Sequence, residues 1–418
     1  MKVFKFGGAS VKDASSMKNV ANIIAQYKSD KLVVVVSALG KTTNALEEVV
    51  QAYFAKNGET KKLIAQLKES HFNICKGLFD DDTHPVYDAL NNFFVEMEWQ
   101  VEEEREEEYN YVYDQIVSVG ELLSTTIISH YMNSIGIHNT WLDVRDVLKT
   151  DDTYREGKVD WNKTSALIHE KVLPFLEKGI VLTQGFLGCT PENCTTTLGR
   201  EGSDYTAAIF TNILNAESQT IWKDVPGVLN GDPRKFDDTQ LLDQISYLEA
   251  VEMTFYGATV IHPKTIKPLQ NKNIPLLVKS FIQPQDKGTV VGVVNSEHLP
   301  AVRMVKGDQC LLTFHTKDFS FVAEDVISHL LDAFSKANFK INMMQNGAIS
   351  FQACVDDIPE KIAKIKTALA STFTIEERHH LTLLTIRHYT DAIILQHKTG
   401  KNLLLEQRRL STWQGLMV

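Results

Sequence analysis

Residues 32–36 read Leu-Val-Val-Val-Val, an apolar run without one polar position, and a turn with Gly40 follows it. A strand with one solvent-exposed face alternates polar and apolar side chains, so this run predicts a central strand buried on both faces. Sheets of such strands are parallel and covered by helices. Short apolar runs at residues 3–6, 140–144, 180–184, 220–223 and 276–279 predict further strands of the same sheet.

Helical patterns separate these strands. Met17, Val20, Ile24 and Tyr27 repeat at helical spacing after the first strand, and residues 60–115 look like a mostly helical insertion. The insertion ends in an acidic run at residues 102–108, which we interpret as a solvated helix face. Alternating strands and helices predict an α/β fold, a three-layer αβα domain with a mostly parallel sheet over residues 1–298.

The composition changes near residue 300, where a second unit begins. Strands are predicted at residues 311–315, 341–344, 349–355 and 381–387, and helices at 323–336 and 358–370. That order is βαββαβ, a small α+β sandwich. With an added hairpin at 403–418, it predicts one regulatory-type domain over residues 299–418.

Composition and net charge limit the classes of molecule that this chain is expected to bind. The chain has 418 residues, 43% of them hydrophobic, and a formal net charge of −10. Nucleic acids and anionic membranes select basic surfaces, so small molecules are the expected ligands. We expect no secretory signal, because residues 1–6 already read as a strand that enters the glycine pair. We expect no membrane span, because no apolar run approaches ~18 residues. The five cysteines form no paired motif, which predicts a cytoplasmic protein without a disulfide framework or a metal site.

Two glycine turns follow predicted strands and suit anions. In residues 5–11, Gly7 and Gly8 let the backbone approach a phosphate, and Lys5 adds a fixed cation. A plain strand-to-helix turn is the alternative. In residues 36–44, the hydroxyls of Ser37 and Thr43 can hold a carboxylate or a phosphate, although a helix cap would look similar.

Two further segments suit an amino acid. Glu121 stands in the apolar helical stretch 118–124, where a carboxylate needs a cation such as a substrate ammonium. A helix-surface glutamate is the alternative. Residues 195–208 crowd Arg200, Ser203 and Asp204 before a helix. Arg200 can grip a carboxylate with two hydrogen bonds, and Asp204 can orient Lys5 or interact with the reacting groups and metal.

The last two segments lie further along the chain. Residues 222–234 end a strand and enter two tight turns, a place where open sheets bind nucleotides. Lys223 and Arg234 are the candidate phosphate partners there. His262, in residues 255–265, reads as a structural turn residue.

These six segments, in this order and spacing, resemble those of the aspartate kinases in the amino acid kinase family, and the C-terminal unit resembles their ACT regulatory domain. The resemblance implies a reaction of ATP with L-aspartate that gives ADP and 4-phospho-L-aspartate, with Mg²⁺ as cofactor. It places the enzyme at the first step toward lysine, threonine and methionine.

The resemblance also assigns residues. It implies that Lys5 is the catalytic lysine and Asp204 the active-site aspartate, beside Gly7 and Gly8. The substrate-binding residues that it implies are Ser37, Thr43, Glu121, Arg200 and Ser203, and the nucleotide-binding residues include Lys5, Gly7, Gly8, Lys223, Asp224 and Arg234.

Some positions depart from the family pattern. Ala9 replaces the usual threonine, Glu201 a common glycine, and Leu229 and Thr259 a tyrosine and a lysine near the nucleotide. Many family members carry two ACT units, whereas this chain has one and a hairpin. Gly347 and Ala348 stand where the resemblance implies a Ser-Glu pair in lysine-sensitive relatives, so feedback by lysine cannot be assumed from the sequence.

Alternatives remain. Sister kinases acting on acetylglutamate, glutamate or UMP share the glycine turn, but give no reason for the C-terminal unit. A non-catalytic amino-acid sensor explains that unit and leaves Lys5 and Asp204 unused. A Rossmann dehydrogenase is disfavoured, since no GxGxxG follows the first strand. Because an isolated βαββαβ sheet leaves an edge that commonly pairs with another copy, we expect a homodimer through residues 300–418, with an amino acid as a possible effector.

Overall fold

The computed structural model describes residues 1–102, 108–258, 261–296, 299–318 and 320–418. The chain forms two compact units. The first comprises Met1–Val228, Leu241–Val251 and Val260–Ser296, and the second Leu229–Gln240, Glu252–Thr259 and Glu297–Val418. Two short segments that the sequence placed in the first domain thus group with the second. The predicted boundary at residue 298, Thr259 and most of the acidic run 102–108 lie outside the described residues.

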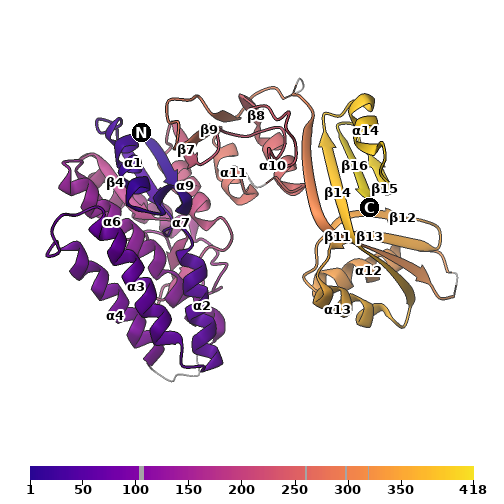
Figure 1. The fold of residues 1–418 in the computed structure, drawn as a ribbon, viewed down its shortest axis with the longest axis horizontal. Coiled ribbons are helices and arrows are strands. Elements are labelled where there is room, and N and C mark those ends of the chain that lie inside the picture. Colours follow the sequence, from indigo (N-terminus) through magenta and orange to yellow (C-terminus); the bar gives the residue numbers. More distant parts are fainter. Residues whose placement is uncertain (103–107, 259–260, 297–298, 319) are drawn as a thin grey trace. The chain divides into compact units, whose positions relative to one another are not determined.

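A mostly parallel sheet forms the centre of the first unit (Figure 1). In the described part of the chain it has eight strands, in the order β3-β4-β2-β1-β7-β9-β10-β8. Neighbours run parallel except β9 and β10. The strands are β1 Lys2–Phe6, β2 Leu32–Val36, β3 Asn139–Leu142, β4 Ile180–Gln184, β7 Ser218–Lys223, β8 Gln244–Ser246, β9 Leu276–Ser280 and β10 Thr289–Gly292.

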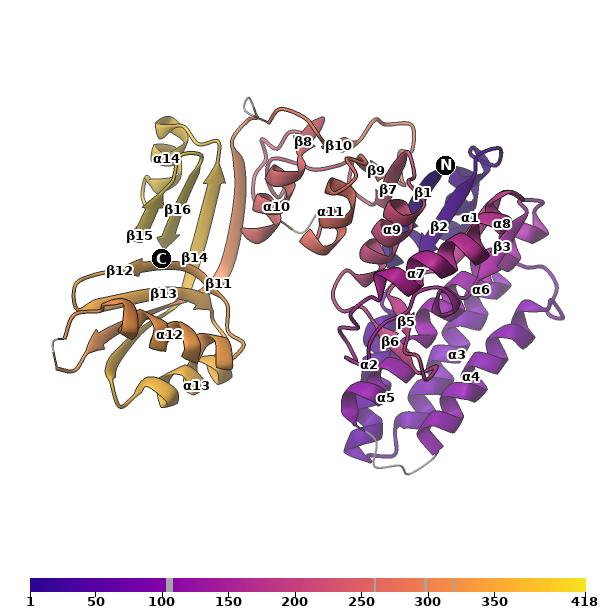
Figure 2. The same ribbon diagram turned by 180° about the vertical axis from the view of Figure 1, so that it is seen from behind.

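Side-chain alternation along the strands divides the core into two layers. Phe4 of β1 and Val34 of β2 belong to one hydrophobic cluster, and Val3 and Val33 to another. The first cluster is covered by α1 Ala14–Ala25, α2 Thr42–Ala55, α3 Thr60–Lys76, α4 Val86–Glu102, α5 Tyr109–Val117 and α6 Val119–Ser134. The second is covered by α7 Trp161–Leu167, η3 Ile168–Val172, α8 Leu173–Leu176 and α9 Gly202–Ile213 (Figure 2). This is the expected three-layer arrangement, with α10 Tyr247–Phe255 and α11 Pro263–Gln270 further along the chain.

Every predicted strand of the first unit is present, with ends shifted by at most a few residues. The sequence did not reveal β8, β10 and the hairpin of β5 Leu187–Cys189 and β6 Thr195–Thr197. These strands have three or four residues each, too few for a periodic pattern. The helical insertion is confirmed, because α3, α4 and α5 occupy it.

The second unit has an antiparallel sheet in the order β12-β13-β11-β14-β16-β15. Its elements are β11 Val302–Thr316, α12 Glu324–Lys336, β12 Ile341–Asn346, β13 Ser350–Asp356, α13 Pro359–Leu369, β14 Phe373–Arg387, α14 Asp391–Lys398, β15 Leu403–Arg408 and β16 Thr412–Met417. The predicted βαββαβ order and hairpin are confirmed; α14 was not predicted.

Strands β11 and β14 are 15 residues long each, far longer than predicted. Their register shifts between Lys306 and Leu311, which divides each strand into two halves. One half packs with α12 and α13, and the other pairs through β14 with β16 and the C-terminal hairpin. No described helix is both long and apolar enough to cross a membrane.

Candidate active site

A cavity of about 670 Å³ opens in the first unit, where strands β1 and β2 end and helices α2, α6 and α9 begin. Parallel strands bring their carboxyl ends to one edge of the sheet, which explains why segments distant in sequence meet there. Among the predicted site residues, those that line the cavity are Lys5, Ser37, Thr43, Glu121, Arg200 and Ser203.

Lys5 and Asp204 form a buried ion pair. The Lys5 Nζ atom lies 2.6 Å from Asp204 Oδ1, and the two side chains are 9% and 0% exposed. The side chains of Lys5 and Val3 point to the same face of β1, because alternate residues of a strand share a face. Helix α9 covers this face. Asp204 stands in the first turn of α9, where the helix dipole favours a carboxylate. The first turn of α9 thus supplies the carboxylate that holds the lysine.

Glycine lets α9 approach the sheet this closely. A Cβ atom on Gly185, just after β4, would lie 2.4 Å from the Cβ atom of Ser203. Real Cβ atoms do not come so close, so any side chain at position 185 would push α9 and its Asp204 outward. Ser203 itself is buried against this turn and lines the cavity.

The turns after β1 and β2 lie against each other. The Gly40 N–H donates to the Gly8 carbonyl at 3.1 Å. A Cβ atom on Gly8 would stand 2.8 Å from the Ala38 carbonyl oxygen, whereas one on Gly7 would stand 3.4 Å from Lys5 Nζ. Gly8 is therefore required by packing. Gly7 and Gly8 adjoin Lys5 but are not among the residues that line the cavity.

Glu121 is a buried carboxylate that faces the cavity from the first turn of α6. Its Oε1 atom accepts a hydrogen bond from the Ala38 N–H at 3.2 Å, and its buried Oε2 atom has no hydrogen-bond partner among the described residues. Burial raises the pKa of Glu121 to about 8, although the Ala38 N–H and the charge of Lys5 act in the opposite direction. Such a group is suited to receive a cation.

Ser37, Thr43 and Arg200 complete the polar lining. Ser37 directly follows β2, and its carbonyl accepts a hydrogen bond from Ser124 Oγ at 2.7 Å. Thr43 lies in the first turn of α2. Arg200 is exposed in the turn before α9, between Gly199 and Glu201, which have φ values of 74° and 57°. The left-handed φ at position 201 is a conformation that glycine adopts more readily than glutamate.

The sequence did not reveal Asp114 and Arg155. Asp114 is fully buried on α5 and accepts hydrogen bonds from Thr197 Oγ1 at 2.7 Å, from the Thr197 N–H at 2.8 Å and from the Arg155 N–H at 2.8 Å. Burial raises the pKa of Asp114. The Arg155 guanidinium lies 4.3 Å from the ring centroid of Tyr113, and both residues line the cavity. Arg155 therefore brings a second guanidinium to the cavity lining.

The predicted nucleotide-binding residues are placed differently. Lys223 ends β7 and is half-buried, and Asp224 next to it is exposed; neither lines the cavity. Arg234 belongs to the second unit, where its Nη2 atom lies 2.9 Å from Asp232 Oδ2. Lys223 and Asp224 therefore lie outside the cavity lining, and the role of all three residues at the nucleotide stays a prediction.

Comparisons with known proteins agree with this geometry. A model of the amino acid kinase family matches residues 1–280. The lysine-sensitive aspartokinase 3 of Escherichia coli is 31% identical over 356 residues, which cover 85% of this chain and 78% of that protein. The chloroplastic bifunctional aspartokinase/homoserine dehydrogenase 2 of Arabidopsis thaliana is 31% identical over 69% of this chain, but the match covers only 32% of that protein.

Solved structures give the same result for the whole chain. Escherichia coli aspartokinase III in complex with lysine and aspartate matches with a TM-score of 0.84 and 26% identity, over 100% of this chain and 95% of that one. The same enzyme in complex with aspartate and ADP matches with a TM-score of 0.84 and 25% identity, over 100% and 96%. The chain therefore belongs to the amino acid kinase family and, within it, to the aspartokinases with a C-terminal regulatory region.

Proposed function

We propose that this chain transfers the γ-phosphoryl group of ATP to the side-chain carboxylate of L-aspartate, giving ADP and 4-phospho-L-aspartate. The observation that carries the proposal is the opposite charge of the groups around one cavity. Glu121 offers a buried carboxylate oxygen without a partner among the described residues, while Lys5 and Arg200 offer cations. A small amino acid with an ammonium and two carboxylates satisfies all of them.

Substrate binding follows from these charges. Arg200 and the Thr43 hydroxyl bind the α-carboxylate, since a guanidinium forms paired hydrogen bonds with a carboxylate. Glu121 binds the ammonium, which neutralises its buried charge. The hydroxyls of Ser37 and Ser203 complete the substrate pocket. These contacts fix the aspartate so that its side-chain carboxylate is directed toward Lys5.

Phosphoryl transfer needs two anions held in line and their charge neutralised. The Lys5 ammonium and the backbone N–H groups of Gly7 and Gly8 stabilise the transferring group. Asp204 positions Lys5 through the buried ion pair. Mg²⁺ enters with the nucleotide as MgATP and neutralises phosphate charge. We assign Lys223, Asp224 and Arg234 to the nucleotide.

The test is acyl phosphate formation trapped with hydroxylamine. The full chain is incubated with MgATP and with aspartate, glutamate or N-acetylglutamate as the phosphoryl acceptor. UMP is tested as an acceptor in parallel, and ADP release is measured for it. We expect hydroxamate from aspartate alone. If another acceptor were preferred, that compound would be the substrate and the proposal of aspartate would be wrong. Calorimetric binding of an amino acid without any MgATP turnover would favour the sensor function instead.

We further propose a cytoplasmic homodimer that forms through residues 300–418 and carries an amino-acid effector. Strands β12 and β15 are the two edges of the second sheet, and edge strands pair readily with a second copy. Met344 on β12 is 50% exposed. Light scattering of the full chain should give twice the chain mass, and Met344→Glu should reduce it if β12 is the pairing edge.

A further inference from the structure

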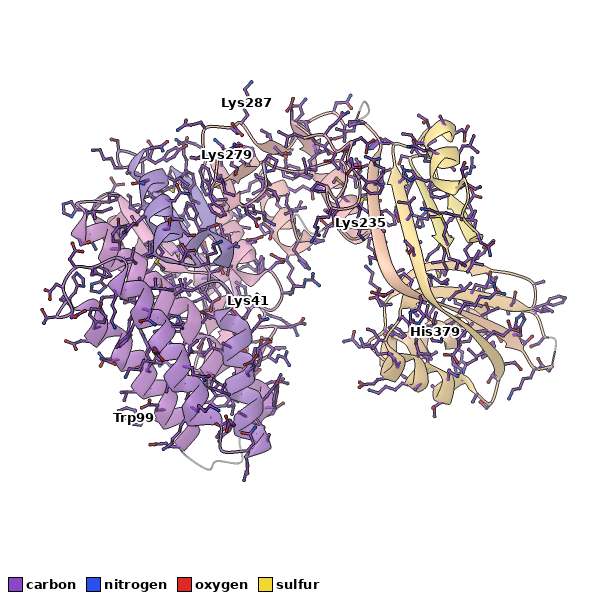
Figure 3. All side chains as sticks on the ribbon, in the orientation of Figure 1. Lys41, Trp99, Lys235, Lys279, Lys287 and His379 are labelled. Atoms are coloured by element: carbon purple, nitrogen blue, oxygen red, sulfur yellow. The ribbon has the colours of Figure 1, made fainter. Side chains whose placement is uncertain are left out.

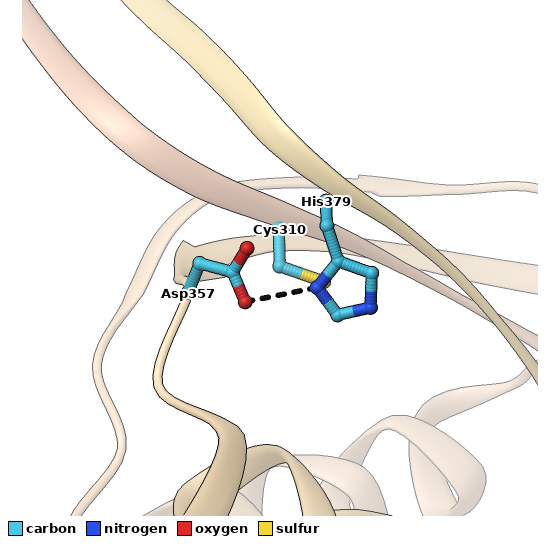
Figure 4. A group of neighbouring side chains, drawn as sticks. All are labelled: Cys310, Asp357 and His379. Carbon is cyan, nitrogen blue, oxygen red and sulfur yellow. Dashed lines mark hydrogen bonds and ion pairs between the residues drawn. The ribbon is translucent and has the colours of Figure 1, made fainter.

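Three side chains that can ligate a metal meet within the second unit (Figure 4). Cys310 lies on β11, Asp357 directly follows β13, and His379 lies on β14. Each offers one ligand atom, and these atoms all lie within 4.8 Å of one another. The His379 Nδ1 atom stands 2.9 Å from Asp357 Oδ1. A sulfur, a nitrogen and an oxygen donor from three separate elements thus converge.

A β-bulge creates this convergence. Leu311 pairs with Arg378 and Gln309 with Leu381, so Cys310 alone opposes two residues of β14, His379 and His380. A bulge of this kind turns a side chain out of its regular alternation. His380 has a left-handed φ of 55°, and its N–H donates to Asp357 Oδ2 at 3.3 Å. The Asp357 carboxylate therefore fastens the bulge and faces the His379 ring.

The other nitrogen of His379 also has a carboxylate partner. Its Nε2 atom lies 3.5 Å from Glu377 Oε2, and Glu377 is in turn paired with Lys366. A metal-ligating histidine commonly donates its second N–H to a carboxylate, which fixes the ring orientation and makes the ligand nitrogen more basic. Glu377 thus stands where the carboxylate partner of a metal-ligating histidine would stand.

The cluster is accessible from one side. Cys310 is buried, whereas the side chains of Asp357 and His379 are 10% and 41% exposed. A cavity of about 300 Å³ lies beside it and is lined by Lys366, Glu377 and His379, with residues of α13. The cavity therefore gives solvent access to the His379 side of the cluster.

A nucleophilic role of Cys310 does not account well for the cluster of Cys310, Asp357 and His379. Cys310 is buried, and the carboxylates of Asp357 and Glu377 are close to its thiol. A reactive thiol needs a lowered pKa and a positive environment. A cation beside these same carboxylates is favoured instead.

We propose that Cys310, Asp357 and His379 bind one divalent transition-metal ion, with Zn²⁺ as the best match. Zinc takes thiolate, imidazole and carboxylate ligands in tetrahedral geometry, and a site with three protein ligands keeps one position for water. Binding forms a metal–sulfur bond and releases the thiol proton to solvent. The ion would join β11, β14 and the segment after β13 at the bulge where the two halves of the sheet meet. This proposal departs from the sequence expectation of no metal site.

The test uses the full chain after removal of metals with a chelator. Titration with Co²⁺, a spectroscopic substitute for Zn²⁺, should produce a thiolate-to-cobalt charge-transfer band that saturates at one equivalent and disappears when Zn²⁺ is added. No cysteine is among the residues that line the 670 Å³ cavity, so a metal bound there gives no such band. Absence of the band in the unmodified chain would overturn the proposal.

Variants identify the ligands. Cys310→Ala and His379→Gln should abolish the band; since His379 is partly exposed, its variant is expected to fold. Glu377→Gln should keep the band but weaken metal affinity about 10- to 100-fold, because Glu377 only positions the ring. The matched controls are Cys354→Ala, at another buried thiol of the same sheet, and His380→Asn, at the imidazole next to His379. Figure 3 labels His379. A band that survives in Cys310→Ala would refute the assignment.

Discussion

The Lys5 ammonium of strand β1 lies 2.6 Å from the Asp204 carboxylate in the first turn of helix α9, and both side chains are buried. The ion pair holds a cation at the edge of the cavity in a fixed position. A preorganised charge of this kind stabilises a transition state more than a mobile one, because little reorganisation accompanies the reaction.

Replacing Lys5 by alanine should lower kcat about 100-fold or more, since loss of one preorganised charge costs about 3–4 kcal/mol of barrier. Steady-state rates of ADP release at saturating MgATP and aspartate measure the effect. Lys2→Ala is the matched control, because Lys2 is on the same strand but pairs with the partly exposed Asp30. Normal turnover of the Lys5 variant would contradict its catalytic role.

The same ion pair predicts that substitutions of Lys5 and Asp204 have non-additive effects on the free energy of unfolding. Lys5→Met leaves the buried Asp204 carboxylate without its cation, and breaking such a pair commonly costs about 3–5 kcal/mol. Adding Asp204→Asn removes the orphaned charge, so the double variant should be more stable than the sum of the two single changes predicts, by about 1–3 kcal/mol.

Urea denaturation monitored by tryptophan fluorescence measures this cycle. Trp222 stacks on Phe6 of the neighbouring strand at 5.9 Å and is a local probe of this part of the sheet. Strict additivity of the two substitutions would show that Lys5 and Asp204 do not interact in solution.

Glu121 predicts a pH dependence. Its pKa is raised from 4.5 to about 8. Between these two pH values, the folded chain without substrate holds a proton on Glu121 that the unfolded chain has lost. The contribution of Glu121 to stability is therefore present below pH 4.5 and is lost as the pH rises through 8. Aspartate binding needs the ionised carboxylate, so kcat/KM for aspartate should increase with pH until about pH 8.

Glu121→Gln should remove this pH dependence and raise KM for aspartate about 10- to 100-fold, because a hydrogen bond to a charged group contributes about 1.5–3 kcal/mol. Glu48→Gln, an exposed position on α2, is the control and should behave like the unmodified chain. An unchanged KM in the Glu121 variant would exclude contact with the substrate ammonium.

Much of the fold and part of the cavity lining could be predicted because the signals are local. The apolar run at residues 32–36 fixes a central strand, and a strand end followed by glycine places Lys5 at the sheet edge. Arg155 gave no such signal. Its position depends on the Asp114 carboxylate, which accepts its N–H from a helix 41 residues away in sequence.

The cluster of Cys310, Asp357 and His379 was missed for a related reason. Metal motifs are recognised by short spacing, whereas these three side chains meet only through the pairing of β11 with β14 and the bulge between them. A bulge is set by register, and register cannot be read from either strand alone. The guanidinium of Arg234 pairs with Asp232 of the same turn, and its assignment to the nucleotide stays a prediction.

Glu201 tests the conformation of the turn before α9. Its φ of 57° is left-handed, where a side chain with a Cβ atom is strained and glycine is not. Glu201→Gly should therefore stabilise the chain by roughly 0.5–1 kcal/mol, less than the full left-handed penalty because glycine also loses more backbone entropy on folding. Urea denaturation measures the gain. Glu201→Ala removes the same carboxylate but keeps the Cβ atom, so it should give no comparable gain; equal stabilisation by both variants would assign the effect to the charge and not to the backbone.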